Sequence, residues 1–120
     1  MENTAEIHSF ISKSLIKHMN TEKNRDQHFI ERAIELSKKG MDSGKGGPFG
    51  CIVVKGDEII GEGSNEVTSL NDPTAHAEVV AIRNACEKLG TYQLTDCEIY
   101  TSCEPCPMCL GAIYWARPSA

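Results

Sequence analysis

Three cysteines, Cys103, Cys106 and Cys109, stand at three-residue intervals in the segment TSCEPCPMCLGAIYW, and this cluster constrains the fold more than any other feature. Pro107 suits the first turn of a helix, so the sequence predicts a helix that begins at this point. Cys106 and Cys109 then lie at positions i and i+3, where both sulfurs can reach a single ion. Helix-start amides and a bound cation both favour the thiolate form that zinc requires.

His76 is the third candidate ligand of such an ion. It stands in the segment NDPTAHAEVVAIRNACEKLG, which predicts a helix that Asp72 or Thr74 caps and Gly90 closes. The imidazole can meet the two sulfurs if both helices begin at the same edge of a sheet. Two thiolates and one imidazole would then hold one zinc ion per chain and leave a fourth position open for water.

Glu78 follows His76 by two residues, which places its carboxylate near the metal without making it a ligand. A carboxylate in that position suits a proton shuttle between water, substrate and leaving group. Together, HAE and PCPMC match the H-x-E and P-C-x-x-C pattern of the zinc deaminases. The sequence therefore predicts Glu78 as the general acid and base of a metal-assisted reaction.

Other interpretations of the cysteines remain open at this level. A Cys-x-x-Cys pair can be redox-active, buried or part of a folding clip. Cys103 could supply a fourth ligand, which would turn the site into a closed structural zinc with no place for water. A buried free thiol is the alternative for Cys103.

The rest of the chain predicts an α/β arrangement. A helix is expected from Asp26 to Gly40, a β-hairpin from the apolar runs 52–54 and 58–60, and a buried strand at 97–101. Residues 1–25 are polar and are interpreted as an N-terminal extension, with the zinc deaminase domain over 26–120. Since a strand normally follows the last helix and the chain stops at RPSA, we expect the domain to be truncated at its C-terminal end.

Composition narrows the class of partner. The chain has 120 residues, 40% of them hydrophobic, which suits one domain. Its formal net charge of −5 argues against a nucleic-acid partner, and no apolar run is long enough for a membrane span. Six cysteines without signs of secretion indicate a reducing, cytoplasmic setting.

The segments GGPFG, NDPTAHAEV and YTSCEPCPMCLGAIYWARP carry a resemblance to a known family. From about Phe29 to Pro118 the chain resembles the cytidine deaminase-like superfamily, and within it the bacterial type of guanine deaminase. The resemblance implies a three-layer α/β/α fold with a central mixed sheet. It also implies a homodimer, in which a C-terminal segment that this sequence lacks is exchanged between subunits.

The resemblance further implies a reaction and a substrate site. His76, Cys106 and Cys109 would hold zinc, and guanine plus water would give xanthine plus ammonia. Asn65 falls where the family hydrogen-bonds the base and Ala77 where a backbone amide does so. The remaining two expected pocket residues are aromatic, Phe49 and Trp115.

Three alternatives to guanine deamination remain. A tRNA adenosine deaminase shares the HAE and PC-x-x-C motifs, although the acidic balance opposes it. A cytosine or cytidine deaminase shares them as well. In the third alternative, the chain is a non-catalytic fragment or partner subunit whose zinc stabilises the fold.

Overall fold

The computed structural model describes the backbone of residues 4–120 and the side chains of residues 23–120. Its elements follow the order α1 (Thr4–Asp42), β1 (Gly50–Lys55), β2 (Glu58–Ser64), α2 (Val67–Leu70), α3 (Ala77–Leu89), β3 (Cys97–Thr101) and α4 (Pro107–Ala116). The hairpin, the strand at 97–101 and the helix that begins at Pro107 are confirmed. The one-turn helix α2 was not expected.

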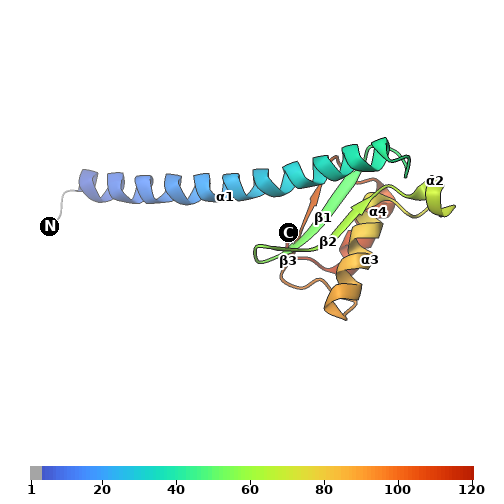
Figure 1. The fold of residues 1–120 in the computed structure, drawn as a ribbon. Coiled ribbons are helices and arrows are strands. Elements are labelled where there is room, and N and C mark those ends of the chain that lie inside the picture. The colour runs from blue at the N-terminus through green and yellow to red at the C-terminus, as the bar shows by residue number, and fades with distance from the viewer. Residues whose placement is uncertain (1–3) are drawn as a thin grey trace.

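The elements form three layers, with α1 on one face of the sheet and α3 and α4 on the other (Figure 1). Strand β1 explains this arrangement, because its residues alternate between two cores. Cys51 and Val53 belong to the core beneath α3, while Ile52 and Val54 belong to the core beneath α1. All four are fully buried, so β1 is the central strand and the predicted α/β/α class is confirmed.

The sheet has the strand order β2-β1-β3, and both pairs are antiparallel. A mixed sheet was expected, but the described strands contain no parallel pair. The closest approach to one lies at the outer edge of β3, where Ser119 N–H donates to the Cys97 carbonyl at 2.9 Å and Ile99 N–H to the Ala120 carbonyl at 2.8 Å. From Cys97 to Ile99 the bonding partner moves from Ser119 to Ala120, so the two segments run in the same direction. Residues 117–120 nevertheless form no strand.

Two predicted helix starts are wrong. Helix α1 begins at Thr4 rather than Asp26, so the expected boundary between extension and domain falls inside one helix. The tyrosyl O–H of Tyr100 donates to Asp26 at 2.6 Å, which gives that carboxylate a tertiary partner. Helix α3 begins at Ala77, because Asp72 accepts hydrogen bonds from the N–H and O–H of Thr74 and holds the preceding residues in a turn.

Helix α3 lies in close contact with β2. Gly63 of β2 faces the first turns of α3, and a Cβ at Gly63 would lie 2.5 Å from the backbone nitrogen of Ala81. The missing side chain therefore lets the helix rest directly on the sheet.

Within the described residues, none of the helices combines the length and apolar character needed to cross a membrane.

Candidate metal centre

The three predicted ligands lie where two helices start. His76 is the N-cap of α3 and Cys106 is the N-cap of α4, and both have extended backbone conformations. The His76 side chain makes no hydrogen bond that caps its own helix. Cys109, in the first turn of α4, is fully buried. The packing of α3 against α4 therefore brings the imidazole to the two thiols, as the sequence predicted.

The distances between these side chains fit a metal site. Nδ1 of His76 lies 3.6 Å from Sγ of Cys106 and 3.5 Å from Sγ of Cys109, and all three donor atoms lie within 4.8 Å of one another. A tetrahedral zinc with bonds of about 2.3 Å to sulfur and about 2.1 Å to nitrogen would place these atoms about 3.6 Å apart. Two thiols and an imidazole are also the donor set that zinc prefers, so the residues fit the metal. Cys103 is not in this group.

The two thiols differ in their electrostatic surroundings. A hydrogen bond from the Cys109 backbone N–H lowers the pKa of Cys106. Burial raises the pKa of Cys109, and a hydrogen bond with the Glu78 carboxylate raises it further. A bound cation opposes this effect at Cys109 because it stabilises the thiolate.

A cavity of about 220 Å³ opens beside these residues. It is smaller than the roughly 300–1,000 Å³ typical of drug-sized ligand sites, and a small ligand suits it. Glu78, which forms part of the wall, is only 5% exposed. The complete lining is Phe49, Asn65, His76, Ala77, Glu78, Cys103, Glu104 and Cys106.

Three of the four predicted substrate-binding residues line this cavity, and one does not. Phe49 precedes β1 and Asn65 follows β2, so both reach the cavity from the open end of the β1–β2 hairpin. Ala77 is the first residue of α3, so its backbone N–H has no acceptor within the helix. Trp115 is absent from the lining and is 72% exposed on α4, so this arrangement does not support a pocket role.

Two lining residues, Cys103 and Glu104, were not predicted to bind substrate. Both are exposed side chains in the turn between β3 and α4. Their position shortly before Cys106 could have indicated this, because residues close to a ligand at a helix start lie near the same edge of the sheet. The structure thus places an additional thiol and carboxylate on the cavity wall.

Comparison with known proteins agrees with this site. Residues 23–120 match the protein family described as the cytidine and deoxycytidylate deaminase zinc-binding region. The guanine deaminase of Bacillus subtilis (strain 168) is 66% identical over 92 residues, which are 77% of this chain and 59% of that protein. The X-ray structure of guanine deaminase from Bacillus subtilis has a TM-score of 0.78 at 65% identity, covering 78% of this chain and 60% of that one.

A second kind of relative is more distant. The tRNA-specific adenosine deaminase of Aquifex aeolicus (strain VF5) is 43% identical over 91 residues, which are 76% of this chain and 60% of that protein. The chain spans about three fifths of the length of these relatives. The expected resemblance to the cytidine deaminase-like superfamily and the expected zinc-binding region are both confirmed.

Proposed function

Because the chain belongs to the family of cytidine and deoxycytidylate deaminase zinc-binding regions, we propose that it carries the catalytic centre for hydrolysis of guanine to xanthine and ammonia. The observation that carries this proposal is the convergence of His76, Cys106 and Cys109 beside the buried Glu78 at a cavity wall. Identity of 66% to a guanine deaminase, against 43% to a tRNA adenosine deaminase, favours guanine as the substrate.

His76, Cys106 and Cys109 are the proposed zinc ligands. When bound, zinc activates water for attack on an aromatic carbon near neutral pH. The protein's contribution is to present one imidazole and two thiolates from helix starts that the sheet holds in place. Glu78 is outside this donor group, which leaves its carboxylate available for proton transfer.

Glu78 is the proposed catalytic residue. Its carboxylate takes the proton that water loses as the oxygen bonds to the carbon bearing the amino group. It delivers this proton to the adjacent ring nitrogen, then takes the second proton from the newly formed hydroxyl group and passes it to the amine, so that the carbon–nitrogen bond breaks, ammonia leaves and a carbonyl remains. The buried position of Glu78 at the cavity wall supports this role, since exclusion of bulk water strengthens its interaction with the reacting atoms.

Phe49, Asn65 and Ala77 are the proposed substrate contacts. The ring of Phe49 offers an apolar surface to a planar base, and the Ala77 N–H and the Asn65 amide offer hydrogen bonds. One ring and a few directed polar groups are a common composition for sites that bind small aromatic ligands. This composition supports a free base as the ligand.

Deamination of adenosine in tRNA is a second candidate, and the relative from Aquifex aeolicus favours it. The formal net charge of −5 opposes it, because RNA binding relies on neutralising phosphate charge. A binding assay with tRNA at several salt concentrations separates the two. Micromolar binding that weakens steeply with salt, together with inosine formation, would replace guanine by tRNA as the substrate.

We also propose a homodimer. Helix α4 is rich in apolar residues, and its side chains Leu110, Tyr114 and Trp115 are 53%, 69% and 72% exposed. Exposed apolar patches on a helix mark surfaces that other molecules cover. Sedimentation at several protein concentrations tests this, with Trp115→Ser expected to shift the mass toward the monomer.

A cytoplasmic location completes the proposal. All six cysteines are free thiols, which suits a reducing compartment. Cell fractionation followed by detection of the protein tests it, and recovery in a secreted fraction with disulfides formed would overturn it.

The decisive experiment measures ammonia release from guanine, adenine and cytosine by the purified protein, with zinc quantified in the same preparation. We expect about one zinc per chain and release from guanine, as the three-ligand site and its neighbouring carboxylate predict. Zinc at this level without ammonia from any base would refute the catalytic proposal and leave the metal with a structural role.

A further inference from the structure

The loop before β1 packs against the segment that follows β2. Asn65 N–H donates to the Phe49 carbonyl at 3.2 Å, and the hydroxyl of Thr68 donates to the Lys45 carbonyl at 3.4 Å. Two backbone carbonyls of the loop over residues 44–49 therefore hold the segment that contains Asn65 and Thr68 against this loop. A change in this loop can reach the cavity through Asn65.

The two ends of the Asn65 side-chain amide have different surroundings. Its Oδ1 accepts a hydrogen bond from the Val67 N–H at 3.0 Å. Val67 is the first residue of α2, so this bond satisfies one of the N–H groups that a helix start leaves without an acceptor. Rotating the amide by half a turn would set Nδ2 against that N–H, donor against donor. Within residues 23–120, Nδ2 has no hydrogen-bond partner.

Gly46 lies directly against this amide. A Cβ at Gly46 would be 2.6 Å from Oδ1 of Asn65 and would also overlap the Asn65 backbone carbonyl. A real Cβ does not approach other atoms this closely, and a backbone carbonyl cannot move aside as the end of a long side chain can. Gly46 does not adopt a left-handed conformation, so the contact with Asn65 is what requires a glycine here.

We propose that Gly46 is a positioning residue: because it has no side chain, the Asn65 amide keeps the orientation that the Val67 N–H sets, and the cavity offers its ligand the Nδ2 donor at this position. The consequence is a preference for a hydrogen-bond acceptor on the ligand edge that meets Asn65. Guanine carries such acceptors at its carbonyl oxygen and unprotonated ring nitrogens. This inference rests on the proposed function, because it assigns the cavity to a base.

The first test compares guanine turnover in the wild type, Gly46→Ala and a matched loop variant, Gly44→Asn. Gly44 has a left-handed conformation that Asn tolerates, and no atom lies within 4 Å of a Cβ built there. We expect KM to rise about tenfold in Gly46→Ala, the effect of one lost hydrogen bond, with bound zinc unchanged. Gly44→Asn should stay within twofold of the wild type.

The second test asks whether the loss passes through Asn65. In an Asn65→Ala background the overlap with the backbone carbonyl of residue 65 remains but the amide is gone, so Gly46→Ala should cost less than threefold in KM if its effect passes through the amide. The same tenfold cost in both backgrounds would overturn the proposal. Asn65→Asp keeps an acceptor for the Val67 N–H but removes the donor, so wild-type KM in that variant would overturn the donor assignment.

The third test needs no turnover and no folded Gly46→Ala variant. Amide hydrogen exchange at Val67 should be slow in the wild type and Asn65→Asp, and at least tenfold faster in Asn65→Ala, because the Oδ1 acceptor is lost. Equal exchange in all three would overturn the inference even if guanine is deaminated. If the wild type releases no ammonia from guanine, the proposed function fails, and the exchange rates still test the position of the amide.

Discussion

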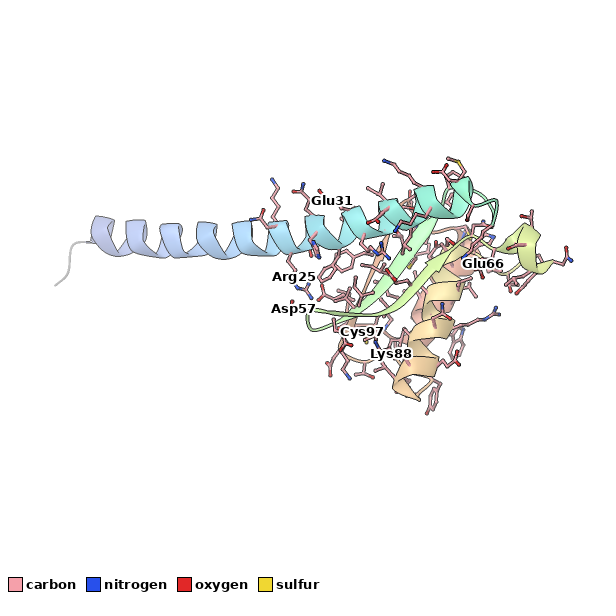
Figure 2. The ribbon with its side chains drawn as sticks, viewed as in Figure 1. Arg25, Glu31, Asp57, Glu66, Lys88 and Cys97 are labelled. Carbon is pink, nitrogen blue, oxygen red and sulfur yellow. The ribbon has the colours of Figure 1, made fainter. Side chains whose placement is uncertain are left out.

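Two clusters of titratable side chains lie on different sides of the sheet, and they differ in how their polar groups are satisfied. The metal centre brings His76, Cys106 and Cys109 together at the starts of α3 and α4, beside a cavity. The second cluster, which we call the Arg25 cluster, consists of Arg25, Asp26, Asp57, Glu98 and Tyr100 and ties α1 to the sheet. Figure 2 shows Arg25 of α1 close to Asp57 in the turn of the hairpin.

The Arg25 cluster pairs its own charges. The guanidinium donates to Asp57, to Glu98 and to the Tyr100 oxygen at 3.0–3.1 Å, and it also meets the Gly56 carbonyl. Burial raises the pKa of Tyr100, and hydrogen bonds to Asp26 and Glu98 raise it further. None of these side chains lines the cavity beside the metal centre.

The comparison teaches that a shifted pKa does not by itself mark a functional site. Both clusters contain groups with raised pKa values, Cys109 in one and Tyr100 in the other. What distinguishes the metal centre is a group of sulfur and nitrogen donor atoms that lie close together beside the cavity and are not paired with a cationic side chain of the group. A structural cluster satisfies its charges internally, whereas a binding site leaves some of them for a ligand.

The largest expected difference between the clusters concerns activity. Glu78→Gln should lower kcat/KM for guanine about 1,000-fold, because it removes the proton-transferring carboxylate. The measurement is ammonia release, with zinc content and melting temperature as controls. Glu98→Gln is the matched change in the Arg25 cluster and should retain activity within twofold. Retention of more than a tenth of the activity by Glu78→Gln would contradict the assigned role.

Removal of the metal should have the next largest effect. Zinc present at about 1,000 times its Kd contributes about 4 kcal/mol to folding stability, so chelation should lower the melting temperature on the order of 10 °C. Cys106→Ser should show the lower value without chelator. Scanning calorimetry with and without chelator gives the result, and identical melting curves would mean that the three donor atoms hold no metal.

Arg25→Met tests the opposite cluster. Loss of its charge-assisted bonds leaves Glu98 and Tyr100 without their cationic partner, and we expect a loss of about 1–2 kcal/mol in the free energy of unfolding. Methionine keeps much of the packing on Phe29, over which the guanidinium lies. Urea denaturation measures the loss. The kcat for guanine should be unchanged, and a tenfold fall would mean that the two clusters are coupled.

Tyr100→Phe is the smallest expected effect, about 1 kcal/mol at neutral pH from loss of the hydrogen bonds around the phenol. The pKa of Tyr100 is raised in the folded protein, so the neutral phenol is the native form. Its contribution is complete below the unfolded value of about 10 and declines as the pH rises above it. Urea denaturation from pH 7 to pH 11 should therefore show the wild type losing its advantage over Tyr100→Phe at the alkaline end. A constant difference across that range would contradict this assignment.

The parts of the fold that were predicted correctly depend on local signals. The β1–β2 turn follows from Gly56, which adopts a positive φ of 64°, and the end of α3 follows from Gly90 at φ 68°. The start of α4 at Pro107 is another local signal. Each depends on the conformational preference of one residue, and such a preference acts whatever the rest of the chain does.

The errors arose where distant contacts overrule local signals. Asp26 could cap a helix, but no glycine or proline interrupts residues 4–39, and Tyr100 and Arg25 hold this part of α1 on the sheet. The substrate role of Trp115 stays a prediction, since α4 is apolar on most sides and carries no local sign of which face is covered. Cys103 and Glu104 line the cavity because the turn after β3 passes beside Asn65 and Phe49, and no local pattern indicates that contact.

The sequence by itself determined which residues are proposed as ligands and as acid, because His76, Glu78, Cys106 and Cys109 stand at the spacing that places such side chains at two helix starts. The tertiary structure decided that the two helices meet at one edge, that Cys103 stays outside the donor group and that Gly46 rests on Asn65. These outcomes depend on packing between segments that lie far apart in the chain. Local spacing cannot encode that packing, since it is set by how the layers fill space.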